Sequence, residues 1–383
     1  MNYGTLSFNQ NVRIEFSSFG AKRSNQECHA VFHVSLDNAD FNTQLCNLHS
    51  AYEKFVKKTK MVAVFKRYFL SDIENQINPL KSALGQLPFC AVSIVQQPPL
   101  NGTKIALWVW FLSKAEDIGI PVQNNSLFGF QHNGYKHYLA TEMYETTGNS
   151  EQQTDQILIN YEEQLQQVEC SLKDNCVRTW LFVSDIDNNY SGVVKARKNN
   201  FTLHNLTEKT HYIASTGIAG RHANPKTTLL FDAYAIDGLS QEQIQFLYAS
   251  ENMSSTYDYG VTFERGVCIK YGDRNHIYIS GTASIDNKGK VLHEGDILKQ
   301  SDRMIENVRA LLHEANSGFD DLAQIIVYLR DTADYKIVNE KMEKEFPGIP
   351  KIITLAPICR PAWLVEMECI AIKEATNNNF EEM

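Results

Sequence analysis

A pattern of elements that recurs three times along the chain constrains its fold more than any other feature. Each copy contains the end of an amphipathic helix, a short polar turn, and an apolar strand that ends in Asp. The matching stretches are residues 52–72, 161–185 and 308–331. In the first helix, Leu45, Leu48, Tyr52 and Phe55 are three or four residues apart, the spacing that gives a helix one apolar face. Because the same order recurs with the same Asp, we interpret the chain as three copies of one unit.

Each copy is expected to have the element order β-β-α-β-α-β-β. A second helical stretch follows each Asp, and two strands then close the copy. Two helices would cover one face of each mixed sheet, and the opposite face, which is also apolar, needs a partner. Three copies in one chain can supply that partner to one another. We therefore predict an α+β fold of three fused units, an intramolecular pseudo-trimer that is a monomer or a weak dimer, with units at residues 1–120, 121–250 and 251–383.

Composition narrows the partners and the compartment. The 383 residues carry a net charge of −9 and give a pI of about 5.7, which argues against a nucleic-acid binder with its basic stripe. The eight cysteines form no CxxC pair, as is typical of proteins from a reducing compartment. The opening residues lack a signal-peptide pattern, and no apolar stretch reaches membrane-spanning length. We expect a cytoplasmic protein without a membrane partner.

The sequence contains no common metal or nucleotide motif. HExxH, Walker and GxGxxG patterns are absent from it. His132 and His137 are close in sequence, but no third ligand for a metal is evident. We expect no metal and no cofactor, and a small molecule as the partner.

The closing strand of the third unit differs from the other two in its charges. The first unit closes with "ALWVWFL", which has no charge, and the second with "LLFDAYAI", which has only Asp232. The third contains "LVEMECIAI", where Glu366 and Glu368 share one face of the strand. A fused trimer needs only one working cleft, so we predict that this cleft lies at the seam between units two and three. A surface strand, or a structural acid bonded to a backbone amide, is the alternative.

Longer motifs connect the chain with known families. The third unit resembles the YjgF/Rid family of small trimeric α+β proteins in "ISGTASID", "ENVRALLHEANSGFDDLAQIIVYLRDTADYKIVNEKM" and "LVEMECIAI". Residues 200–372 resemble the chorismatase family, closest to its 3-hydroxybenzoate-forming members, in "THYIASTGIAGR", "YGVTFERG", "YGDRNHIYISGTASID" and "APICRPAWLVEMECIAI". The chain departs from that family at Ala219, where an acidic residue is expected, and its first 120 residues match only through the repeat.

The chorismatase resemblance implies a set of site residues. Glu366 stands where Rid proteins carry their active-site glutamate, and it would protonate the methylene carbon of the enolpyruvyl group. Cys359 would lie beside the cleft, as in the 3-hydroxybenzoate-forming members. Arg221 and Arg330 would clamp the two carboxylates of chorismate, because the planar arginine fork binds such groups in a bidentate manner. The other implied substrate contacts are Tyr212, Arg265, Gly281 and Arg360.

Each of these assignments has an alternative. Any one arginine can be a surface charge, and a lone cysteine in an apolar strand is usually a small buried hydrophobe. Glu368 is interpreted as support for Glu366, and Trp108 and Trp110 as core packing.

The resemblance implies a chorismatase that converts chorismate to 3-hydroxybenzoate and pyruvate. The reaction would proceed by protonation of the enolpyruvyl ether and aromatisation of the ring, and it would need no cofactor. A Rid-like imine or enamine deaminase is one alternative. A non-catalytic protein that binds a small ligand is another, and it would leave Glu366 without surroundings that raise its pKa.

Overall fold

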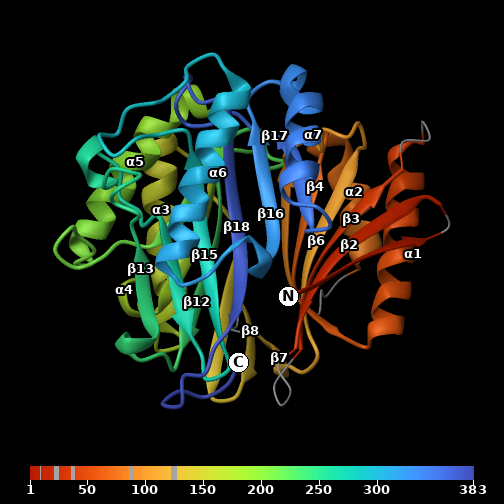
Figure 1. The fold of residues 1–383 in the computed structure, drawn as a ribbon, viewed down its shortest axis with the longest axis horizontal. Helices are drawn as coiled ribbons and strands as arrows, with labels where there is room; N and C mark the ends of the chain where they lie inside the picture. Colours follow the sequence, from red (N-terminus) through yellow and green to blue (C-terminus); the bar gives the residue numbers. More distant parts are fainter. Residues whose placement is uncertain (9, 21–25, 36–38, 86–89, 122–126) are drawn as a thin grey trace.

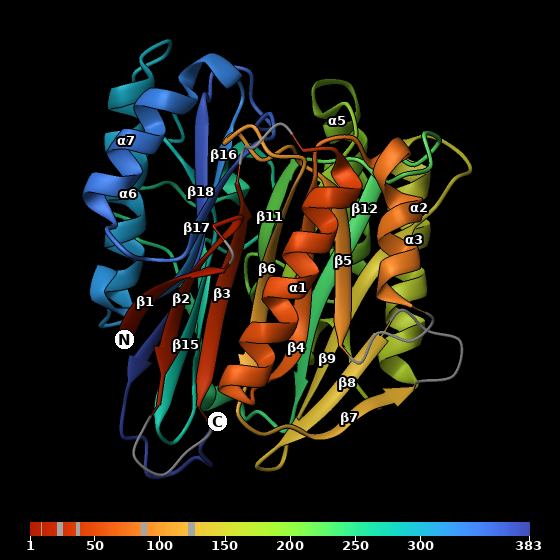
Figure 2. The same ribbon diagram turned by 90° about the vertical axis from the view of Figure 1, so that its right-hand side faces the viewer.

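The computed structural model describes residues 1–383 except 9, 21–25, 36–38, 86–89 and 122–126, and in this part of the chain it contains three six-stranded mixed sheets with helices on their outer faces (Figures 1 and 2). The first sheet has the strand order β1 (Asn2–Phe8), β2 (Val12–Phe19), β3 (Glu27–Val34), β6 (Ile105–Leu112), β4 (Val62–Leu70) and β5 (Ala91–Gln96). Its helices are α1 (Phe41–Thr59) and α2 (Ile73–Leu84).

The other two sheets repeat this topology. The second runs β11 (Ala214–Ala219), β10 (Cys176–Val183), β12 (Leu229–Asp237), β9 (Tyr135–Tyr144), β8 (Leu127–His132) and β7 (Glu116–Pro121). Its helices are α3 (Ser150–Gln166), α4 (Leu172–Asn175) and α5 (Ile186–Leu203). The third runs β13 (Ile244–Leu247), β14 (Gly266–Lys270), β15 (Arg274–Ala283), β18 (Val365–Glu374), β16 (Leu322–Leu329) and β17 (Lys351–Leu355). Its helices are α6 (Ile297–Glu314) and α7 (Tyr335–Glu345).

The predicted α+β fold of three fused units is confirmed, and the structure adds one strand to the start of each unit. The added strands β1, β7 and β13 lie at the edges of their sheets. The sequence signal for β1 and β13 is weak, because β1 exposes much of its length and β13 has only four residues. The last strand of the first sheet ends at residue 112 and the first strand of the second sheet begins at residue 116. The second sheet ends at residue 237 and the third begins at residue 244. Both changes of sheet come slightly before the predicted unit boundaries. That each unit is a separate domain stays a prediction.

Local signals in the sequence begin several of the helices. Asp40 accepts a hydrogen bond from the Thr43 backbone N–H at 3.0 Å and caps α1. Asn149 and Gln152 form a reciprocal capping box at the start of α3. No helix in the described ranges is long and apolar enough to cross a membrane.

The inner faces of the sheets pack against one another around the centre of the molecule. Trp108 and Trp110 are buried there, and their predicted role in packing is confirmed. The Trp108 indole N–H donates to His29 Nδ1 at 3.3 Å, and the Trp110 ring meets the Tyr234 ring edge-on at 5.8 Å. Strand β5 lies against β9 of the second sheet, and β11 lies against β15 of the third. These two seams therefore bring the edge of one sheet to the middle of the next.

Three buried arginines join the three units in a cycle, which we call the arginine ring. Each pairs with a carboxylate of another unit, at distances of 2.9, 2.8 and 3.2 Å between the closest nitrogen and oxygen atoms. The pairs are Arg67–Asp232 between units one and two, Arg178–Glu368 between two and three, and Arg274–Glu27 between three and one. All six side chains are buried. A buried charge without its partner is costly, so the ring favours one arrangement of the units.

Glu27 also has partners beyond Arg274. Its carboxylate lies 2.8 Å from His276 Nε2 and 3.1 Å from His29 Nε2. Burial by itself would raise the pKa of Glu27, but the charge and hydrogen bond of His276, together with those of His29, outweigh it and hold the pKa well below its usual range. Glu27 is therefore an ionised centre that two units share.

We predict that Glu27→Gln destabilises the protein by about 1–3 kcal/mol, because it removes the buried charge that Arg274 and His276 share, although Arg274 keeps its pair with Asp273. The free energy of unfolding would be measured by urea denaturation at neutral pH. The matched control is Glu151→Gln, which breaks the exposed pair of Glu151 with Lys195 at 2.9 Å and should cost less than about 1 kcal/mol. Equal losses in the two variants would show that the arginine ring does not hold the units together.

Candidate functional site

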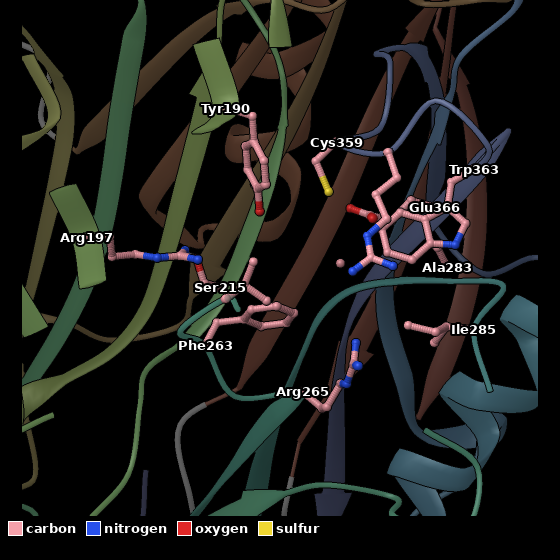
Figure 3. Close-up of a pocket in the computed structure, with 14 residues that line it drawn as sticks. Tyr190, Arg197, Ser215, Phe263, Arg265, Ala283, Ile285, Cys359, Trp363 and Glu366 are labelled. Atoms are coloured by element: carbon pink, nitrogen blue, oxygen red, sulfur yellow. The ribbon is translucent and has the colours of Figure 1, made fainter. Parts of the chain in front are cut away.

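A cavity lies at the seam between units two and three, where the sequence places the working cleft (Figure 3). It encloses about 50 Å³. Unit two lines it with Tyr190, Arg197, Ser215 and Gly217, and unit three with Val261, Phe263, Arg265, Gly281, Ala283, Ile285, Cys359, Arg360, Trp363 and Glu366.

The periodicity of the elements explains why these residues meet. Tyr190 and Arg197 are seven residues apart on α5, so they lie on one face of the helix. Ser215 and Gly217 are two apart on β11 and point to the same side of the sheet. Strand β18 supplies Glu366 from the middle of the third sheet. The cavity is thus built where a helix and an edge strand of one unit cover the sheet of the next.

Glu366 is a buried acid that carries its proton at neutral pH. Its side chain is 5% exposed, and among the residues that the structure describes no hydrogen-bond partner satisfies its carboxyl group. Burial, and next the charge of Glu368, raise the pKa of Glu366 to about 8, although Arg265 and Arg178 act in the opposite direction. A neutral carboxyl group that faces a cavity can donate a proton to a bound molecule.

Glu368 has the opposite role on the same strand face. Its carboxylate accepts hydrogen bonds from Arg178 at 2.8 Å, from the Trp180 indole N–H at 2.9 Å and from the Thr216 hydroxyl. These bonds fix the carboxylate in place. The two acids of the "LVEMECIAI" strand are therefore a neutral proton donor and a fixed anion, a division that their different surroundings produce.

Gly281 makes room for the Glu366 carboxyl group. It lies in a bulge where the pairing of β15 with β18 shifts between Ile279 and Thr282. A Cβ atom built on Gly281 would lie 2.2 Å from Glu366 Oε1, which is far inside van der Waals contact. Any residue larger than glycine would therefore displace the acid.

The corresponding bulge of unit two contains Glu142 instead of glycine. Strands β9 and β12 shift register at the same point of the topology, and Glu142 lies there with a positive φ of 58°. Its carboxylate reaches across the seam to accept a hydrogen bond from the Ile94 backbone N–H at 2.7 Å. A side chain thus occupies, at the seam between units one and two, the space that Gly281 leaves open between units two and three.

Cys359 and Tyr190 face each other across the seam. The Tyr190 phenol belongs to unit two and the Cys359 thiol to unit three, and both line the cavity. Burial, and next the neighbouring Glu366, raise the pKa of the Cys359 thiol to about 12. The thiol is therefore neutral at physiological pH and is a poor nucleophile, so it can shape and polarise the cavity without attacking a bound molecule.

Three arginines give the cavity a positive lining. Arg197 donates to the Ser215 hydroxyl at 3.4 Å, and Arg265 donates to the Ser254 carbonyl at 3.0 Å. Arg360 stacks over the Trp363 ring, with 4.8 Å between its guanidinium carbon and the ring centre. The only carboxyl group in the lining, that of Glu366, is neutral. This charge distribution favours a small molecule that carries more than one anionic group.

Five of the eight residues that the resemblance implied line this cavity: Glu366, Cys359, Arg265, Gly281 and Arg360. The other three lie outside it. Tyr212 lines a neighbouring outer pocket, and its backbone N–H donates to Glu264. Arg221 is 40% exposed and pairs with Glu74 at 2.8 Å at the seam between units one and two. Arg330 pairs with Asp187 at 3.0 Å. Arg221 and Arg330 each bind a carboxylate of the protein in this structure, and their role as carboxylate clamps stays a prediction.

Sequence reasoning missed Tyr190, Arg197, Phe263 and Trp363. The spacing of seven between Tyr190 and Arg197 was the available signal, but the same spacing describes ordinary packing of a helix on a sheet. Trp363 is part of the motif "CRPAWLVEME", but the motif does not indicate whether its side chain faces the cleft. His137 was considered as a metal ligand in the sequence. In the structure its Nδ1 forms a hydrogen bond of 2.7 Å with the Tyr234 hydroxyl, and its ring stacks on Phe130.

Comparisons with known proteins agree with this architecture. The model of the family described as Endoribonuclease L-PSP matches residues 263–373. A RutC family protein of Pyrococcus abyssi is 35% identical over 108 residues, which are 28% of this chain and 84% of that protein. The 3-aminoacrylate deaminase RutC of Acinetobacter baylyi is 32% identical over 99 residues, which are 25% of this chain and 79% of that protein. A crystal structure of a chorismatase superposes with a TM-score of 0.63 and 15% identity, covering 81% of this chain and 92% of that one.

We predict that the free energy of unfolding decreases as the pH rises from about 5 to 8, because of the Glu366 carboxyl group. In this range the unfolded state has released the Glu366 proton and the folded state, with a pKa of about 8, retains it. Unfolding then releases one proton, which lowers the free energy of unfolding by about 1.4 kcal/mol per pH unit. Glu366→Gln should remove this contribution, as urea titrations at several pH values would measure. The Glu151→Gln control should retain the wild-type slope. An unchanged slope in Glu366→Gln would mean that the folded protein ionises Glu366.

Proposed function

We propose that this chain, which belongs to the RutC family through its third unit and has the fold of a chorismatase, is an enzyme that converts chorismate to 3-hydroxybenzoate and pyruvate. One observation carries the proposal: a cavity lined by three arginines contains a single acid, Glu366, which is neutral and faces the interior. Chorismate has two carboxylates for the arginines and an enol ether for the acid to protonate.

The charge of the substrate matches the lining. Arg197 enters from unit two, whereas Arg265 and Arg360 enter from unit three. The ring carboxylate and the enolpyruvyl carboxylate can therefore bind arginines from both sides of the seam. Guanidinium groups suit this task, because they stay charged when buried and make paired, charge-assisted hydrogen bonds.

The first chemical step is transfer of a proton from Glu366 to the methylene carbon of the enolpyruvyl group. The resulting oxocarbenium carbon accepts the oxygen of the ring 4-hydroxyl, which forms a cyclic ketal. The bond between ring carbon 4 and that oxygen then breaks, ring carbon 3 loses its proton to the Glu366 carboxylate, and the ring becomes aromatic. The proton released by the 4-hydroxyl returns to the same oxygen, and the hemiketal collapses to pyruvate and 3-hydroxybenzoate. The products together have the atoms of chorismate, so no water is consumed.

Exclusion of water decides between this product and a simple hydrolysis product. If water added to the oxocarbenium carbon, pyruvate would leave and a dihydroxylated cyclohexadiene would remain. The cavity holds only about 50 Å³, and Tyr190, Cys359 and Trp363 line it. A ring bound against these side chains would take up the space inside the cavity. A filled, closed cavity leaves no place for a reactive water molecule.

We predict that the purified protein releases pyruvate and 3-hydroxybenzoate from chorismate in equal amounts. Pyruvate would be followed with lactate dehydrogenase and the ring product by chromatography. Glu366→Gln should lower the rate by about 10²–10⁴-fold, since the amide cannot provide the proton. The wild-type rate should decrease as the pH rises above about 8, where Glu366 loses its proton. Absence of turnover in the wild type, or full activity of Glu366→Gln, would refute the assignment.

We predict that Cys359→Ala shifts the product towards the non-aromatic diene while pyruvate release continues. The smaller side chain opens space for a water molecule beside the oxocarbenium carbon. The ratio of the two ring products would be measured by chromatography at matched extents of pyruvate release. Cys369→Ala is the matched control, because Cys369 is a buried cysteine of β18 that does not line the cavity. If Cys359→Ala still yields only 3-hydroxybenzoate, the thiol only fills space.

A deaminase that acts on an enamine is the second candidate. The likeness of the third unit to 3-aminoacrylate deaminase RutC favours it. Such an enzyme would release ammonia from 3-aminoacrylate and leave chorismate unchanged, so the same protein preparation tests both candidates.

A further inference from the structure

We propose that Arg330 is a positioning residue that ties together the two walls of the cavity and so sets the product, a role that rests on the proposed function. Arg330 follows β16 and does not line the cavity. Its two terminal nitrogens donate to the two Asp187 oxygens at 3.1 and 3.0 Å, and Nη2 also donates to the Ile358 carbonyl. One guanidinium group therefore joins α5 of unit two to the segment of unit three that carries Cys359.

The bond to Asp187 fixes the helical wall. Asp187 lies in the first turn of α5, where the helix dipole favours a negative charge. The hydrogen bond from Arg330 lowers the pKa of Asp187, so the carboxylate stays ionised. Tyr190 follows three residues later on the same face of the helix. A movement of Asp187 would therefore carry the Tyr190 hydroxyl with it.

The bond to Ile358 fixes the opposite wall. Backbone hydrogen bonds hold the two ends of this segment to the end of β16: Ala356 N–H donates to the Leu329 carbonyl at 2.9 Å, and Arg330 N–H donates to the Leu364 carbonyl at 3.1 Å. Between these ends, the Arg330 side chain holds the Ile358 carbonyl, one residue before Cys359. The Arg330 side chain thus adds a link from the end of β16 to a segment that the Ala219 N–H of β11 also holds, through the Pro357 carbonyl at 3.1 Å.

Arginine is suited to this position by its geometry. Its planar fork makes a bidentate pair with Asp187 and still directs a donor to Ile358, whereas a lysine ammonium group provides one point charge. Because Tyr190 and Cys359 line the cavity from its two units, the fork determines how tightly the seam closes over a bound ring. A weaker contact of Arg330 with Asp187 and Ile358 should admit water to the cavity without removing a contact to the substrate.

The test compares Arg330→Ala, Arg330→Lys and Asp187→Asn with a matched control, Lys195→Ala. Lys195 is also on α5 and pairs with Glu151 at 2.9 Å, but it does not line the cavity. We expect kcat to fall by up to about 10²-fold in Arg330→Ala, as for other misplaced catalytic groups, with KM nearly unchanged and a larger share of the diene product. Arg330→Lys should be intermediate, and Lys195→Ala should behave as wild type. A raised KM with an unchanged product ratio would make Arg330 a substrate clamp and overturn the proposal.

A second measurement does not depend on turnover. Cys46 is the exposed cysteine, so a Cys46→Ser background allows the Cys359 thiol to be followed with a maleimide and mass spectrometry. Labelling of Cys359 should be several-fold faster in Arg330→Ala and Asp187→Asn than in Lys195→Ala. Asp187 is 46% exposed, so Asp187→Asn keeps the fold even if Arg330→Ala does not. Equal labelling rates would overturn the positioning role. If Cys359 is labelled faster in these variants but the protein does not convert chorismate, the positioning role of Arg330 is supported and only the proposed reaction is refuted.

Discussion

The structure depends on three buried ion pairs that connect its units head to tail. Arg67, Arg178 and Arg274 each reach from one unit into the next, and each meets a carboxylate that is as buried as the arginine itself. Such pairs add little net stability compared with apolar packing, but separating them is costly. The ion pairs therefore determine which unit packs against which. Apolar packing alone would not determine this, because the three sheets have similar apolar faces.

One of these pairs also prepares the chemistry of the cavity. Arg178 holds Glu368 as an anion, and the negative charge of Glu368, after burial, is the main reason that Glu366 keeps its proton. The same ion pair thus joins two units and sets the protonation state of an acid two residues away. The seam between units one and two contains a parallel arrangement, because Asp232, the partner of Arg67, helps burial to raise the pKa of Glu142 to about 8.

The sequence was sufficient to predict the repeat, the seam and the special character of the closing strand, because these follow from periodicity and from local charge. It was insufficient for the lining of the cavity. Tyr190 and Arg197 reach the site only because α5 of one unit packs beside the sheet of another, and this contact depends on the register between units. Arg221 and Arg330 were assigned from motifs, yet each is held by a carboxylate, Glu74 or Asp187, that is more than 140 residues away in the chain. A raised pKa of Glu366 was expected from its proposed role, but the contribution of Glu368 to it became visible only in the structure.

The glycine in the β15 bulge has a consequence for how the chain saturates with ligand. In a trimer of identical subunits, a cleft beside such a bulge would be present three times, and the occupied copies could influence one another. Here the equivalent bulge of β9 is filled by Glu142, and β3 pairs with both of its neighbours without a shift of register. A ligand that enters beside Gly281 therefore binds once per chain. We expect its binding isotherm to be a simple hyperbola with a stoichiometry of one. Titration with a tight inhibitor would then give the concentration of functional protein.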